Sequence, residues 1–210
     1  MKYSAQILFF MLVATGFSTT AKAETALQAH VKFFDTNENG LITIPETYQG
    51  LRKLGFGIME SVKISTVVGV LVGPKTYYSM WDMFSLNITN IKQGVHDSHT
   101  GVYDAEGNFN EERLRELFSK FDTNMDQMLS QDEINAMLKA NYQTSFGHSA
   151  SKGEFDFLMR IASKEENIHG KSVSAVTYQT MLDMYEGRLL YQVAEKIAQQ
   201  KQNGHPQTEL

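Results

Sequence analysis

The chain has 210 residues, 42% of them hydrophobic, and a formal net charge of −5. This length and apolar content suit a single domain with a substantial core, and the acidic balance argues against nucleic acid and favours a protein that binds cations. The sequence contains no cysteine, which excludes disulfides, thiolate nucleophiles, cysteine-rich zinc sites and a thiolate-ligated haem.

Residues 1–23 have the composition of a secretory signal peptide. Lys2 gives a positive start, residues 7–13 form an apolar core that is too short to span a bilayer, and Ala21-Lys22-Ala23 is a cleavage site. We therefore expect a secreted or periplasmic protein.

The first predicted helix begins at a capping box formed by Thr25 and Gln28 and runs into a polar loop. Its apolar face, at helical spacing, consists of Leu27, His30, Val31 and Phe34. A histidine thus lies on the apolar face, and by itself it is most simply interpreted as a hydrogen-bonded core residue.

Residues 35–46 match the EF-hand calcium loop at every position that the chemistry requires. Gly40 occupies the sixth position, where the chain turns with positive φ. A plain turn would need neither a glutamate six residues after this glycine nor an apolar residue at position 8, which is Ile42 here. Because few ligands are charged, we expect a site of moderate rather than high affinity. The predicted ligands are Asp35, Asn37, Asn39, Leu41, Thr43 and Glu46.

Residues 58–72 form an apolar run that follows the helix after the loop and is closed by Gly73-Pro74. Four aromatic residues come next: Tyr77, Tyr78, Trp81 and Phe84. Two interpretations stay open. The segment is either a membrane-interface anchor or a core helix followed by core aromatics.

A second EF-hand loop is predicted over residues 122–133, after a polar loop at 93–108 and a helix capped by Asn110. Its sixth position holds Gln127, and a left-handed conformation there costs a non-glycine residue about 1–2 kcal/mol. The loop is therefore either a weakened calcium site or a vestigial one. Its predicted ligands are Asp122, Asn124, Asp126, Met128, Ser130 and Glu133.

The predicted fold is all-α, with a paired EF-hand core, an inserted apolar segment and C-terminal helices. We expect the two loops to pair through short strands, which would bring Ile42 close to Leu129. A linker is expected at 141–153, followed by three helices that carry the apolar residues Phe155, Phe157, Leu158, Ile161, Val176, Met181, Leu182, Tyr185, Leu189, Leu190, Val193 and Ile197. This domain would comprise residues 24–200, and residues 201–210 would be a disordered tail.

The stretch from Leu27 through the first loop to Phe56 resembles the signature of caleosins, which are calcium-binding, lipid-associated proteins. Several caleosins are haem peroxygenases. The similarity continues in order over nearly all of residues 26–200, in the pieces His96 to Phe109, Phe118 to Lys120, Phe157 to Lys164 and Gly187 to Tyr191.

The resemblance implies a haem b associated with His30 and His96. His30 would be the proximal ligand, and His96 would be a second ligand or a distal acid/base. The implied reaction transfers oxygen from a fatty-acid hydroperoxide to an unsaturated lipid at a membrane or lipid surface.

The proline-rich knot of the family is missing, because Pro74 is the only proline between Glu46 and His205. We therefore expect shallow, peripheral attachment to a membrane or lipid particle. The alternative function is a non-enzymatic EF-hand module that binds calcium and then exposes an apolar surface towards lipid. The expected partners are calcium ions and lipid, without nucleic acid.

Overall fold

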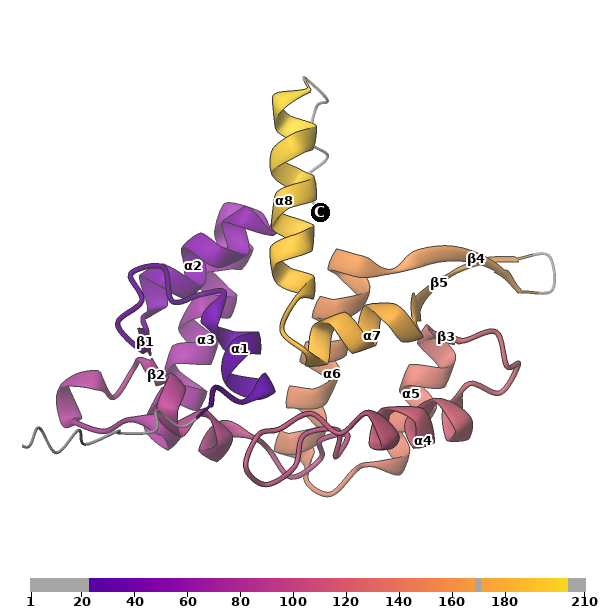
Figure 1. Cartoon of the computed structure of the whole chain (residues 1–210), viewed down its shortest axis with the longest axis horizontal. Helices are drawn as coiled ribbons and strands as arrows, with labels where there is room; N and C mark the ends of the chain where they lie inside the picture. The colour runs from indigo at the N-terminus through magenta and orange to yellow at the C-terminus, as the bar shows by residue number, and fades with distance from the viewer. Residues whose placement is uncertain (1–22, 169–170, 204–210) are drawn as a thin grey trace, which may run out of the picture.

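The computed structural model describes residues 23–168 and 171–203 and consists mainly of helices with small sheets (Figure 1). The predicted signal peptide, apart from Ala23, lies outside the described residues, as do positions 204–210 of the predicted tail. The elements form two groups of similar design, one built from residues 26–94 and the other from residues 111–185.

The first group contains the first EF-hand and the helical segment that follows it. Its short strands β1 and β2 pair antiparallel, with Leu41 opposite Asn87 and Ile42 opposite Leu86. The elements are α1 (Ala26–Lys32), β1 (Leu41–Ile42), α2 (Ile44–Lys53), α3 (Ile58–Thr76), the 3-10 helix η1 (Met80–Asp82), β2 (Leu86–Asn87) and the 3-10 helix η2 (Ile88–Gly94).

The second group repeats this plan around the second EF-hand. Strand β3 pairs antiparallel with β5, with Leu129 opposite Val176, and β5 also pairs with β4. The elements are α4 (Glu111–Phe121), β3 (Met128–Ser130), α5 (Gln131–Ala140), α6 (Ser145–Ala162), β4 (Lys164–Ile168), β5 (Lys171–Thr177) and α7 (Tyr178–Tyr185).

The predicted pairing of the two calcium loops is wrong. Ile42 pairs with Leu86 and Leu129 pairs with Val176, so each loop joins the strand of the helix–strand–helix segment that follows it in the chain. Pairing within each group closes a shorter stretch of chain than pairing between the groups, and it leaves each loop with a strand partner that is not a calcium loop.

Local chemistry sets the helix starts where the sequence predicted them. Thr25 and Gln28 form the expected capping box, Asn110 caps α4, and equivalent capping boxes at Thr43 and Ser130 begin α2 and α5. Each box satisfies backbone N–H groups that have no partner within the helix.

Other boundaries differ from the sequence-based expectation. The linker predicted at 141–153 is mostly helix, because Thr144 caps α6 and this helix runs for 18 residues. Val176 lies in β5 and not in a helix. The prediction of an all-α fold is therefore wrong in part, because the described residues are mainly helical but also form small sheets. Pro74 does not end α3, which continues to Thr76. The last helix, α8 (Leu189–Gln202), extends past residue 200, so the first two residues of the predicted disordered tail at 201–210 are helical.

Helix α8 rises between the two groups in Figure 1 and packs on the first of them. Its Leu190 is buried with Phe33, Leu51, Leu54 and Phe56. The preceding turn has Gly187 at φ +78°, and a Cβ there would lie 2.8 Å from the backbone nitrogen of His30. This close approach of backbone to backbone leaves no room for a side chain.

Candidate functional site: a histidine-lined pocket

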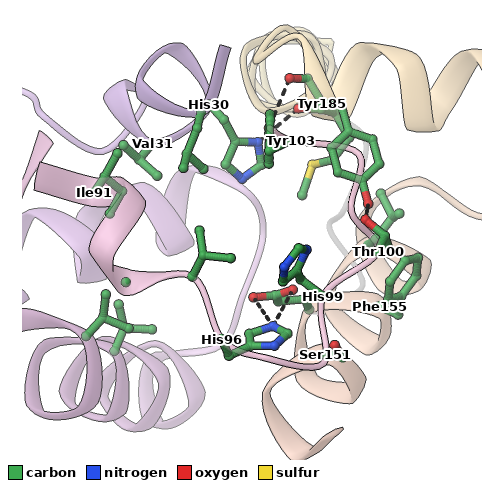
Figure 2. A pocket seen from close by; sticks show the side chains of 18 of the residues that line it. His30, Val31, Ile91, His96, His99, Thr100, Tyr103, Ser151, Phe155 and Tyr185 are labelled. Carbon is green, nitrogen blue, oxygen red and sulfur yellow. Dashed lines mark hydrogen bonds and ion pairs between the residues drawn. The ribbon is translucent and has the colours of Figure 1, made fainter. Parts of the chain in front are cut away.

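A cavity of about 300 Å³ lies between the two groups (Figure 2). Its walls are mostly aliphatic and include Leu27, Val31, Val68, Val72, Ile91 and Leu158. The polar lining residues come from α1, the loop after η2, α6 and α7: His30, His96, His99, Thr100, Tyr103, Ser151, Glu154 and Tyr185. Apolar walls with a few convergent polar groups are typical of a ligand site.

His30 projects from α1 towards this cavity, and α7 fixes its ring (Figure 2). Its Nδ1 lies 2.9 Å from the backbone oxygen of Met184. A carbonyl can only accept, so Nδ1 carries the hydrogen and Nε2 keeps its lone pair. Burial lowers the pKa of His30 from its ordinary value, although the Met184 bond opposes the shift.

His96 comes from the loop after η2 and is only 9% exposed. Its Nε2 lies 3.3 Å from Oε1 and 3.4 Å from Oε2 of Glu154, and it donates to this carboxylate. Its Nδ1 is buried and has no hydrogen-bond partner among the described residues. A buried ring nitrogen without a partner is an uncommon arrangement, and it leaves Nδ1 available to a ligand or to water.

Two tyrosines bind the loop to α7 beside these histidines. The Tyr103 hydroxyl donates to the backbone oxygen of Tyr185 at 3.0 Å, and the Tyr185 hydroxyl lies 2.8 Å from Oγ1 of Thr100. Burial raises the pKa of both phenols, so both remain neutral. These bonds hold the loop in place and keep the His30 and His96 rings at a common cavity.

The sequence did not identify His99, Glu154, Met184 or Tyr185 as part of this site. Of these four, only His99 could have been indicated by the sequence, because it lies three residues after His96 in the same loop. The other three lie on helices far along the chain, and no spacing relates them to His30.

The lining residues fit a haem in three respects. His30 offers an Nε2 lone pair, and its Nδ1 is bonded to a carbonyl, an arrangement that is usual for a metal-binding histidine. His96 offers a buried nitrogen that lacks a partner. The aliphatic walls suit a flat apolar ring system.

The first calcium loop has the backbone that its sequence predicts. Gly40 has φ +82°, and Asp35 accepts hydrogen bonds from the backbone N–H groups of Asn39 and Gly40 at 3.2 and 2.9 Å. Burial would raise the pKa of Glu46, but hydrogen bonds from Thr43 and Thr36 outweigh it and lower this pKa.

The second loop repeats these contacts almost atom for atom. Asp122 accepts from the N–H groups of Asp126 and Gln127 at 3.2 and 2.9 Å, and Glu133 accepts from Ser130 and Thr123. Gln127 has φ +62°, which is the left-handed conformation expected from its position. In the described ranges no three His, Cys, Asp or Glu side chains cluster closely enough to hold a metal. An ion in either loop would also need amide, hydroxyl and carbonyl oxygens as ligands.

Comparisons with known proteins place the chain in a family. The model of the caleosin related proteins matches residues 22–194. The chain belongs to the caleosin family. Among curated caleosin-type relatives, a protein of Arabidopsis thaliana named "Probable peroxygenase 4" is 27% identical over 92% of this chain and 98% of its own length. A Lilium longiflorum protein named "Peroxygenase" is 32% identical over 69% of this chain and 62% of its own length. No solved structure matches this caleosin.

Proposed function

We propose that this caleosin is a haem-dependent peroxygenase that binds calcium and acts on fatty-acid hydroperoxides and unsaturated lipids. The observation that carries the proposal is the His30 ring, which faces an apolar pocket with a free Nε2 and an Nδ1 bonded to Met184. The names of the relatives support the same reaction class.

In the proposed reaction a hydroperoxide ROOH gives one oxygen atom to an unsaturated acceptor and becomes the alcohol ROH. The hydroperoxide is reduced by two electrons and the acceptor is oxidised by two, so no other oxidant or reductant is needed. A bound haem would supply the iron at which the O–O bond is broken.

The chain's own residues would hold, shield and exchange protons. His30 would bind the iron through Nε2. His96, whose Nε2 is occupied by Glu154, would present the Nδ1 lone pair as a second ligand or as the base that takes the hydroperoxide proton. The aliphatic wall would exclude water from the reacting oxygen atoms.

Attachment to a lipid surface is part of the proposal and is supported by the side chains of α3. This helix buries small residues, namely Ser61, Ser65, Gly69, Gly73 and Thr76. Most of its larger apolar residues point outward, whereas Ile64, Val68 and Val72 pack inward. The exposed residues are Ile58, Met59, Val62, Val67, Val70 and Leu71, together with Tyr77, Tyr78, Met80, Trp81 and Phe84 beyond the helix. Such a surface favours an interfacial anchor over a core helix. Over the described ranges, no helix combines the length and apolarity that crossing a bilayer requires.

Calcium binding at residues 35–46 belongs to the same proposal. The loop begins five residues after His30 and is continuous with α1, so an ion would fix the angle of the helix that carries the histidine. Calcium would then influence turnover without taking part in the chemistry.

Titration with hemin tests the enzymatic hypothesis. Wild-type protein should develop an absorbance band that saturates, and His30→Ala should lose it together with turnover of a fatty-acid hydroperoxide. His148→Ala, which removes a histidine outside the pocket lining, should keep both. If the wild-type protein takes up no hemin, the non-enzymatic calcium module is the better description.

A further inference from the structure

The three histidines of the pocket differ in the partner of one ring nitrogen, and this partner decides where the hydrogen of the neutral ring lies. His30 Nδ1 faces a carbonyl, and His96 Nε2 faces a carboxylate, so both of these nitrogens donate. The opposite nitrogen of each ring, Nε2 of His30 and Nδ1 of His96, therefore carries a lone pair.

His99 has the reverse arrangement. Its Nδ1 lies 2.9 Å from the backbone nitrogen of Gly101. A backbone N–H can only donate, so Nδ1 must accept and the hydrogen of the neutral ring is on Nε2. The positive φ of Gly101, +75°, shapes the turn that presents this N–H. His99 is an exposed residue that lines the pocket, and its neutral imidazole offers a donor on Nε2.

His99 also occupies a particular place. It lines both the pocket and a second cavity of about 360 Å³. Thr100 and Tyr103 also line both cavities. Figure 2 shows its ring among the side chains that line the cavity, which also include His96.

We propose that His99 is a catalytic residue whose Nε2–H donates to the hydroperoxide oxygen that remains bonded to carbon. The inference rests on the proposed peroxygenase function and adds a residue that neither the family signature in this chain nor the His30–His96 pair supplies. Negative charge builds up on this oxygen as the O–O bond breaks, and a positioned donor stabilises it.

The protons balance in this scheme. His96 Nδ1 takes the proton of the terminal oxygen and passes it, directly or through water, to the oxygen that remains on carbon, which leaves as the alcohol. His99 keeps its Nε2 proton throughout and only donates a hydrogen bond to that oxygen.

The hydrogen positions can be measured without any haem. Long-range ¹H–¹⁵N correlation spectra of the full chain should show His99 protonated on Nε2 and His30 protonated on Nδ1, with the signals assigned by loss in His99→Gln and His30→Gln. A His99 ring protonated on Nδ1 would overturn the proposal, whether or not hemin binds.

A second measurement separates this proposal from the proposed function. His99→Leu and His99→Gln should bind hemin as tightly as the wild-type protein, because His99 is not the ligand. Fluoride, which binds ferric hemin and accepts hydrogen bonds, should bind about tenfold more weakly to His99→Leu, whereas His99→Gln keeps a donor and most of the affinity. Hydroperoxide turnover should fall about 100-fold in His99→Leu and recover in part in His99→Gln.

The outcomes are distinct. If the wild-type protein binds no hemin, both the proposed function and the role of His99 fail. If hemin binds and His99→Leu keeps the fluoride affinity of the wild-type protein, only the role of His99 fails.

Discussion

The two calcium loops differ most consequentially at one residue, their sixth. Gly40 and Gln127 have nearly the same backbone conformation, with φ +82° and +62°, and the aspartates that begin the two loops accept equivalent hydrogen bonds. Gln127 therefore adopts a left-handed conformation that glycine adopts without strain. At position 40 a side chain would be strained only through its backbone conformation, because a Cβ built on Gly40 meets no atom within 4 Å.

Substitutions at the sixth position of each loop test whether this backbone conformation limits calcium affinity. Gln127→Gly should tighten calcium binding at the second loop, and Gly40→Ala should weaken the first loop, each by roughly 5- to 30-fold, which corresponds to about 1–2 kcal/mol. Isothermal calorimetry on both variants measures the two constants. Unchanged weak binding in Gln127→Gly would mean that the second loop takes no ion.

A second residue-scale prediction concerns His30 and pH. Burial lowers its pKa in the folded protein below the value in the unfolded chain. As the pH falls through the ordinary histidine range, the unfolded chain binds a proton that folded His30 does not, so the free energy of unfolding decreases. Urea unfolding at pH 7.5 and 5.5, at constant calcium, should show a larger loss in the wild-type protein than in His30→Gln. Equal losses would show that the ring is solvated.

At the scale of elements, the sequence predicts what adjacent residues decide. The capping residues Thr25 and Asn110 and the glycine at position 40 act within a few residues, and each was predicted correctly. Strand pairing is not local. Val176 was predicted to lie in a helix with Met181 and Tyr185, but pairing with Leu129, 47 positions earlier in the chain, holds it in β5.

Helix α6 provides a prediction at this scale, because two of its glycines have opposite surroundings. A Cβ at Gly147 would overlap Asp97 Oδ1 and lie 2.7 Å from Ser98 Oγ and 3.0 Å from the Ser98 backbone nitrogen, whereas a Cβ at Gly153 meets nothing within 4 Å. Gly147→Ala should destabilise the protein by about 1–3 kcal/mol, since it forces the His96 loop away. Gly153→Ala should stabilise it by about 1 kcal/mol.

Urea unfolding of these two variants measures both effects, and hemin titration shows whether the displaced loop alters the pocket. Equal free energies of unfolding in the two alanine variants would mean that residues 96–98 can move away from α6 without destabilising the protein.

At the scale of the whole molecule, the candidate site depends on contacts between the two groups. The family signature predicted that His30 and His96 act together, and the structure places both at one cavity. The residues that orient them, Met184 and Glu154, come from α7 and α6, and no sequence pattern relates them to the first group. The site could therefore be predicted as a pair of histidines but not as a pocket.

The exposed aromatic segment gives a prediction at the same scale. Trp81 is 96% exposed and is the only tryptophan, so its emission should shift to shorter wavelength when phosphatidylcholine vesicles are added. Trp81→Ala should reduce vesicle flotation about tenfold, while Tyr142→Ala, at an exposed aromatic on the second group, should not. A wild-type protein that stays in the soluble fraction at every lipid concentration would contradict the interfacial anchor.

The hydrogen bond between His30 and Met184 joins residues 154 positions apart. During synthesis from the N-terminus, the first calcium loop is complete long before α7 emerges, so ion binding can organise α1 while the histidine still lacks the carbonyl that orients it. The His30 ring acquires its fixed tautomer only when the chain is nearly finished. A cofactor that requires this tautomer would be loaded after translation, and a chain truncated before residue 184 should bind calcium but remain colourless with hemin.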